Sequence, residues 1–193
     1  RNTWSTFAGA PKTVTLSYDG LLGKNLGIGV MAFQDNYGNL IIPTGPVINS
    51  SFVTNTSLGN TEVYDNIIKW ANQLAIPVTF TEAGNITSIS IYHEGGTGNL
   101  IMGVYSDQNG YPSSRIGITV STAVDPEAGW QTIQLSTPVQ VVTGQKVWLS
   151  WVFQNNPGIR YMKGTPGRAA SLNTWTSGMP LDYGTSTIAG TKY

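Results

Sequence analysis

The chain has 193 residues, contains no cysteine, and balances 10 Lys and Arg residues against 10 Asp and Glu residues. The absence of cysteine excludes disulfides and thiolate metal sites, and a net charge of zero without a basic stripe argues against nucleic acid as a partner. No apolar run approaches the ~20 residues that a membrane-spanning helix requires.

The composition favours a secreted or cell-surface protein built from strands. Gly occurs 23 times and Pro 10 times, and only 10% of the residues are charged. Such a composition suits many short strands that are joined by tight turns. Because the net charge is zero, repulsion between copies is weak, so self-association is permitted.

Residues 1–58 are predicted to form an N-terminal β extension and connector. Residues 13–18 alternate cleanly between apolar and polar side chains, which predicts a half-buried strand. The apolar positions are Val14, Leu16 and Tyr18, and the polar positions are Thr13, Thr15 and Ser17. Residues 28–33 and 40–42 predict two further short strands, and residues 43–59 are rich in Pro, Ser, Thr, Asn and Gly, as expected of a connector.

Residues 59–193 are predicted to form the main domain. Apolar side chains between residues 67 and 75 are spaced like one face of a helix, which predicts a helix before Pro77. Alternating runs then predict strands, each bounded by turn residues, at residues 78–81, 86–93, 99–105 and 116–120. Turn signals every 8–12 residues between such strands are typical of an antiparallel sandwich or jelly roll.

Residues 130–153 are predicted to hold three antiparallel strands, with the last, residues 147–153, central in a sheet. Val147, Leu149, Trp151 and Phe153 share one face of that strand, so we expect them to be buried together. Trp148 has the opposite parity, which leaves it exposed or covered by another layer. Residues 165–190 show few alternating runs and predict little regular structure beyond a short strand at 159–161.

Five stretches of the chain carry a resemblance to a known family. They are residues 59–64 (GNTEVY), 88–100 (SISIYHEGGTGNL), 103–117 (GVYSDQNGYPSSRIG), 129–135 (GWQTIQL) and 147–161 (VWLSWVFQNNPGIRY). Together they resemble a β-sandwich module that is found, often repeated, in large secreted or surface-anchored bacterial proteins. The resemblance covers residues 59–193 and implies an all-β, antiparallel β-sandwich of jelly-roll type. It implies no catalytic residue and no cofactor. Relatives continue past the position of Tyr193 with one more short apolar strand, so the resemblance also implies an open apolar groove here.

The inventory of reactive side chains predicts a protein that is not an enzyme and that has no cofactor. His93 is the only histidine, and its neighbour Glu94 points to the opposite face of the strand, so we expect His93 to cap a hydrogen-bond network at a turn or strand end. Without a second histidine or a cysteine, a conventional catalytic triad and a zinc site are excluded. No pair of carboxylates stands out as a glycosidase pair. Asp107, close to Asn109 and Gly110, is a weak candidate for calcium binding, and a plain turn is the favoured interpretation.

Exposed aromatic residues are the remaining candidates for binding. A planar side chain can stack on a sugar ring or anchor a protein–protein interface, and core packing is the alternative for each. The candidates are Trp4, Trp70, Trp130, Trp148 and Trp175. Asn49, Asn55 and Asn85 lie in Asn-x-Ser/Thr sequons, which are glycosylation acceptors in a host that glycosylates.

Two functions from different classes fit these observations. The first is an extracellular structural or adhesive subunit that binds copies of itself. In this hypothesis residues 13–18 insert into the groove of the next copy, and a head-to-tail filament follows. The alternative is a non-catalytic carbohydrate-binding module of jelly-roll type, with polysaccharide as the partner.

Overall fold

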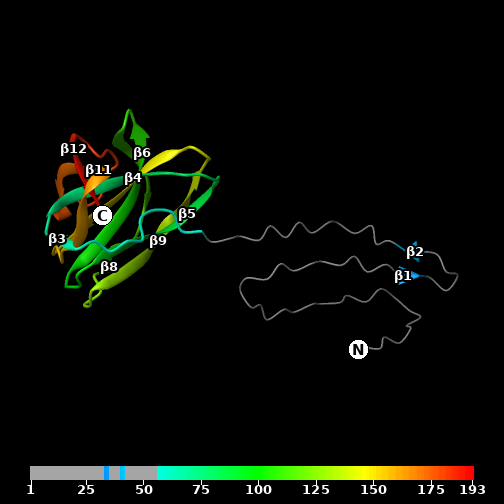
Figure 1. Cartoon of the computed structure of the whole chain (residues 1–193), viewed down its shortest axis with the longest axis horizontal. Helices are drawn as coiled ribbons and strands as arrows, with labels where there is room; N and C mark the ends of the chain where they lie inside the picture. Colours follow the sequence, from blue (N-terminus) through cyan, green and yellow to red (C-terminus); the bar gives the residue numbers. More distant parts are fainter. Residues whose placement is uncertain (1–32, 35–39, 42–55) are drawn as a thin grey trace. The chain divides into compact units, whose positions relative to one another are not determined.

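A computed structural model of the chain describes residues 33–34, 40–41 and 56–193, which fall in two compact units, Arg1–Val53 and Thr54–Tyr193. In the first unit, β1 (Phe33–Gln34) pairs antiparallel with β2 (Leu40–Ile41), at the site of the strand predicted for residues 40–42 (Figure 1). The predicted strand at residues 13–18 lies outside the described residues.

The second unit is built from antiparallel strands, so the predicted all-β class is confirmed. Its only helical element among the described residues is a 3₁₀ turn, η1 (Trp175–Ser177). The strands are β3 (Asn66–Ile68), β4 (Asn72–Thr79), β5 (Gly84–His93), β6 (Asn99–Gln108), β7 (Tyr111–Ile118), β8 (Thr122–Ala123), β9 (Gly129–Val141), β10 (Lys146–Phe153), β11 (Ile159–Thr174) and β12 (Ser186–Lys192).

The strands form one antiparallel sheet of ten strands that curves until it nearly closes, and the long strand β11 takes part in both of its halves, which we call the two layers. One layer has the order β7-β6-β10-β4-β11-β12, with β8 also beside β6, and the other contains β9, β5, the start of β11 and β3. β11 takes part in both because Ile159 pairs with His93 and Ile68, whereas Ala169 pairs with Ala75. The sheet closes further where Thr119, just after β7, forms a bridge to Leu135 of β9.

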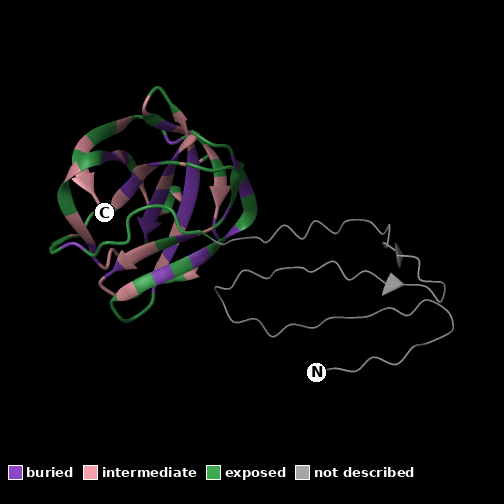
Figure 2. Cartoon of the chain, turned by 45° about the vertical axis from the view of Figure 1, so that its right-hand side comes forward, coloured by how far each residue is buried: buried purple, intermediate pink, exposed green. Residues whose placement is uncertain are grey.

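The space between the two layers holds the larger core, which we call the inner core. Val147, Trp151 and Phe153 of β10 are buried in it, and Leu149 packs against it partly buried, so the predicted apolar face is confirmed. Figure 2 shows that the buried positions follow the strands, whereas the connecting loops are mostly exposed. The buried members of the inner core are Leu74, Ile86, Ile89, Leu100, Met102, Val104, Val124, Ile133, Leu135, Val139, Val141, Val147, Trp151, Phe153 and Ile159.

A smaller core, which we call the outer core, lies on the other face of β10. Its members are Ala75, Tyr105, Trp148, Val152, Ala169, Met179 and Tyr183. Met179 and Tyr183 come from the segment between η1 and β12, which covers this face of the sheet. Trp148 is therefore only 2% exposed, and β10 is buried on both faces.

The helix predicted between residues 67 and 75 is wrong. The structure has strand β3 there, followed by the start of β4. Leu74 belongs to the inner core and Ala75 to the outer core, so two consecutive strand residues are both buried. Burial of a strand on both faces removes the alternation of apolar and polar residues, and the remaining apolar run then imitates helical spacing.

Three other boundaries also differ from the predictions. Gly129–Val141 form one strand, β9, whose pairing with β5 shifts register between Ile86 and Ser88, instead of two separate strands. Strand β7 begins at Tyr111 and not at residue 116, because Asn109 (φ 55°) and Gly110 (φ 84°) form a two-residue hairpin turn with positive φ at both positions. Most of β11 and most of β12 fall within residues 165–190, where alternation is hidden because β11 has a register shift between Lys163 and Arg168.

Candidate functional site

An apolar cleft opens between the two layers, and its total volume, counting solvent at its opening, is about 550 Å³. Side chains of six strands line it, including Ile76 of β4, Ile89 of β5, Met102 of β6 and both Leu149 and Trp151 of β10. These residues belong to the inner core or pack against it. The cleft is thus a place where the core of the domain reaches the surface.

Tyr193 forms part of the cleft wall. Its ring packs edge-on against Trp151, with the ring centroids 5.2 Å apart, and the Asn60 side-chain amide donates a hydrogen bond to its carbonyl oxygen over 3.1 Å. Burial raises the pKa of the Tyr193 hydroxyl group to about 12, although the nearby charge of Arg168 acts in the opposite direction. The hydroxyl oxygen is buried and has no hydrogen-bond partner among the described residues.

An aromatic pair on β5 and β9 also lines the cleft. Trp130 is 46% exposed, and its ring meets Tyr92 edge to face with the centroids 5.8 Å apart. The two residues are direct cross-strand partners. Next to them, the hydroxyl groups of Ser90 and Thr132 share a hydrogen bond of 2.7 Å on the exposed face. This part of the site combines a planar apolar surface with hydroxyl groups.

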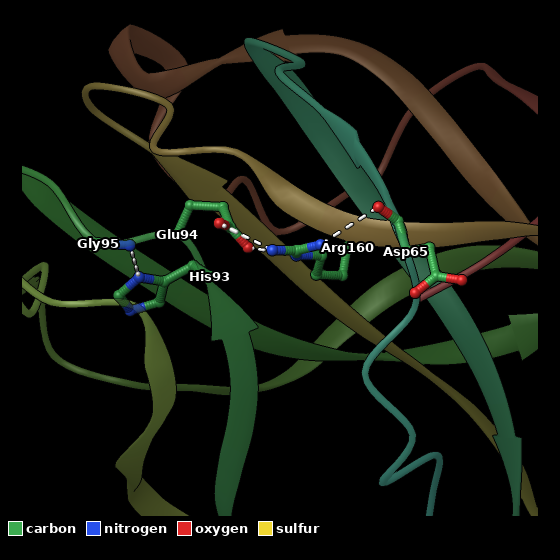
Figure 3. Close-up of polar contacts among 5 residues, drawn as sticks. All are labelled: Asp65, His93, Glu94, Gly95 and Arg160. Carbon is green, nitrogen blue, oxygen red and sulfur yellow. Dashed lines mark hydrogen bonds and ion pairs between the residues drawn. The ribbon is translucent and has the colours of Figure 1, made fainter.

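A charged cluster holds the start of β11 against its neighbours. Arg160 donates hydrogen bonds to both carboxylate oxygens of Glu94, and its Nη1 atom donates to the Asp65 carbonyl over 3.2 Å (Figure 3). The hydrogen bonds to Glu94 raise the pKa of the Arg160 guanidinium above its ordinary value. The fork fixes the orientation of the Arg160 side chain, which also lines the cleft.

His93 is fully buried and belongs to a structural hydrogen-bond network. The Gly95 amide donates to Nδ1 over 3.1 Å, so Nε2 carries the proton and donates to the Gln131 amide oxygen over 2.8 Å. The imidazole ring points away from the Glu94 carboxylate (Figure 3). The predicted role of this histidine in a hydrogen-bond network is confirmed.

The Asp107 carboxylate is occupied by donors of the protein. It accepts hydrogen bonds from Trp148 Nε1 (2.7 Å) and the Gly110 amide (3.2 Å), and it pairs with Lys146 over 3.2 Å. Burial raises the pKa of Asp107, but the bonds from Trp148, Lys146 and Gly110 outweigh it and the pKa lies below its ordinary value. Within residues 56–193 and the two short N-terminal strands, no group of three or more His, Asp or Glu residues could hold a metal ion.

The other predicted site residues lie apart from one another. Trp70 is 38% exposed and stacks on the Arg168 guanidinium, whose central carbon is 4.8 Å from the ring centroid. Trp175 of η1 packs partly buried against the outer core, and Asn85 is exposed on β5. Trp4, Asn49, Asn55 and residues 13–18 lie outside the described residues.

The cleft brings Trp130 together with residues that the sequence analysis did not select. Tyr92 follows the alternating run of β5 on its polar face, which is the one signal in the sequence that could have identified it. Arg168 lies within residues 165–190, where few alternating runs are visible, and Tyr193 follows that stretch. Arg168 is on β11 and Tyr193 directly follows β12, and these two strands pair with each other.

Comparisons with known proteins inform the N-terminal part of the chain. Residues 1–62, which are fewer than half of the chain, match the family described as type IX secretion system membrane protein PorP/SprF. None of the curated proteins and none of the solved structures matches the chain. In the part of the chain that the structure describes, no helix is long and apolar enough to cross a membrane. In its first 62 residues, the chain is similar to type IX secretion system membrane proteins of the PorP/SprF family.

Proposed function

We propose that this chain is a non-enzymatic structural or adhesive subunit of the bacterial cell surface, associated with type IX secretion, whose cleft binds a segment of another copy. The match of residues 1–62 supports the location. One observation carries the binding role, because the inner core reaches the surface in a cleft beside Tyr193. The jelly-roll layout implied by the resemblance remains part of the proposal, and two layers joined by β11 are compatible with it.

The proposed occupant of the cleft is the strand predicted at residues 13–18. Its apolar side chains, Val14, Leu16 and Tyr18, match the apolar wall around Trp151. Within the described residues, β12 pairs only with β11, so the other edge of this strand offers unpaired N–H and C=O groups. A strand donated by one copy to the next produces a head-to-tail assembly.

Deletion of residues 1–20 is expected to abolish self-association and to leave the β domain folded. The domain keeps both of its cores, which the structure builds from residues of 74–183, and it loses only the donated segment. Sedimentation velocity and negative-stain electron microscopy measure assembly, and far-UV circular dichroism measures the fold.

A matched pair of variants separates the donated face from general effects of the deletion. Val14→Asp with Leu16→Asp places charge on the apolar face of the strand and should block assembly. Thr13→Asp with Thr15→Asp places the same charge on the opposite face and should weaken assembly far less. Assembly of the deletion variant at the wild-type level would rule out strand donation.

Carbohydrate binding is a second candidate because Trp130 and Tyr92 present a partly exposed aromatic pair. The apolar C–H face of a sugar can stack on an indole ring, and neighbouring hydroxyl groups can bond to the sugar. Ser90 and Thr132 supply such hydroxyl groups beside the pair. The site would bind the glycan without reacting with it.

Trp130→Ala is expected to weaken retention on a polysaccharide gel by about tenfold or more, the effect of losing an aromatic anchor. Affinity electrophoresis of the full chain against a panel of neutral and acidic polysaccharides measures it. Val142→Ala, which removes another exposed apolar side chain that does not line the cleft, is the control and should migrate as wild type does. If wild type and Trp130→Ala migrate alike on every gel, the glycan alternative is wrong.

A further inference from the structure

A buried cation without an anion lies close to the cleft. Arg168 is 8% exposed, and its Nε and Nη1 atoms are buried without a hydrogen-bond partner among the described residues. The two ion pairs in this part of the chain are Lys146–Asp107 and Arg160–Glu94, so neither involves Arg168. Burial of an unpaired guanidinium is unfavourable, and an anion that hydrogen-bonds to it would remove most of that cost.

The direction of the side chain places this cation on the inner side of β11. Ala169 belongs to the outer core, whereas Ala170 packs against the inner core. Since alternate residues of a strand share a face, Arg168 points to the same side as Ala170, which is the side of the cleft. The Trp70 ring stacks on the guanidinium. Trp70 is itself 38% exposed, so it separates the buried guanidinium from solvent.

Tyr193 provides a second unpaired donor on the same side. Its ring lines the cleft, and its hydroxyl group is buried without a partner in the described part of the chain. Burial raises the pKa of this hydroxyl group, and the charge of Arg168 acts in the opposite direction. On β4, Ala75 pairs with Ala169 and the next residue, Ile76, lines the cleft, so Arg168 and Tyr193 both lie on the side of the cleft. The guanidinium and a phenol that keeps its proton both donate hydrogen bonds, so the ligand that suits them is an acceptor with negative charge.

We propose that Arg168 and the Tyr193 hydroxyl group form a carboxylate-binding site beside the cleft, and that its occupant is Asp19 of a second copy. The inference rests on the proposed function, in which residues 13–18 of one copy enter the cleft of the next. Asp19 is the only carboxylate side chain in the first 34 residues, and it directly follows that segment. Apolar contacts alone would allow the donated strand to bind in registers that differ by one or two residues. The charge pair would select one of these registers.

Three variants of the full chain test the pair. Asp19→Asn and Arg168→Gln remove one charge each while keeping similar size, and the double variant Asp19→Arg with Arg168→Asp exchanges the two charges. We expect each single variant to raise the dissociation constant of assembly, measured by sedimentation velocity, by about tenfold or more. The exchanged pair should recover part of that loss. Thermal melts followed by circular dichroism show whether each variant is folded, and if Arg168→Gln is not folded, Asp19→Asn alone tests the pair.

The outcomes separate this inference from the function on which it rests. If Val14→Asp with Leu16→Asp blocks assembly but Asp19→Asn and Arg168→Gln do not weaken it, the cleft still accepts the strand and the charge pair is wrong. If wild type itself does not assemble, both the function and the pair are wrong. Octanoate, a free carboxylate, can also be tested for binding to a chain that lacks residues 1–20. If octanoate binds there through Arg168, and Asp19→Asn does not affect assembly of the full chain, the site binds a free carboxylate and Asp19 is not its occupant.

Discussion

Trp151→Ala should lower the free energy of unfolding by about 3–5 kcal/mol, the range for truncating a buried aromatic side chain. Trp151 is 5% exposed and lies in the inner core on β10, which pairs with β4 on one side and β6 on the other. Its ring also supports Tyr193 at the cleft. The truncation therefore leaves a cavity in a strand that cannot shift without moving both neighbours.

Urea titration followed by far-UV circular dichroism measures this loss. Trp130→Ala is the matched control, since it removes the same side chain from a position that is 46% exposed, and it should cost under about 1 kcal/mol. A loss below about 1 kcal/mol for Trp151→Ala would contradict its assignment to the inner core.

Trp148→Ala should destabilise the domain by a similar amount, about 3–5 kcal/mol, because the outer core buries this residue as completely as the inner core buries Trp151. Met179 and Tyr183 cover it, and its Nε1 atom donates a hydrogen bond of 2.7 Å to Asp107. Truncation removes packing on the second face of β10 together with a bond to a carboxylate.

A second substitution divides these two contributions. Trp148→Phe keeps an aromatic ring in the outer core and loses the hydrogen bond to Asp107, so it should cost about 1.5–3 kcal/mol, the range for a bond to a charged group. Urea titration of both variants gives the two values. Equal and small losses for Trp148→Ala and Trp148→Phe, each under about 1 kcal/mol, would mean that the segment between η1 and β12 does not cover the sheet.

The cleft connects stability to the proposed assembly. Trp151 and Tyr193 belong to the inner core and also line the cleft, so substitutions there affect both the fold and the binding surface. Arg168 is different, because it contributes an unpaired charge and no ion pair among the described residues. Its replacement by an amide of similar length is for that reason the sharper test of binding.

The sequence by itself determined the all-β class and the face of β10 that lies in the inner core. Alternation from Val147 to Phe153 was sufficient for that, because the side-chain period of a strand follows from backbone geometry alone. The sequence also predicted that His93, the only histidine, takes part in a hydrogen-bond network. Its hydrogen bonds to Gln131 and Gly95 confirm this prediction.

Only the tertiary structure decided what covers the other faces. Periodicity reports to which side a residue points, but it carries no information about whether a distant segment packs on that side. Trp148 is buried because residues 178–185 return to cover it. Leu74 and Ala75 are both apolar because β4 contributes to both cores, and this apolar pair has the spacing that incorrectly predicts a helix. The cleft, with Tyr193 in its wall and Arg168 on the same side of β11, follows from long-range pairing of β11 with β4, β5 and β12. Such contacts join residues far apart in the chain, which is why no local pattern in the sequence could predict them.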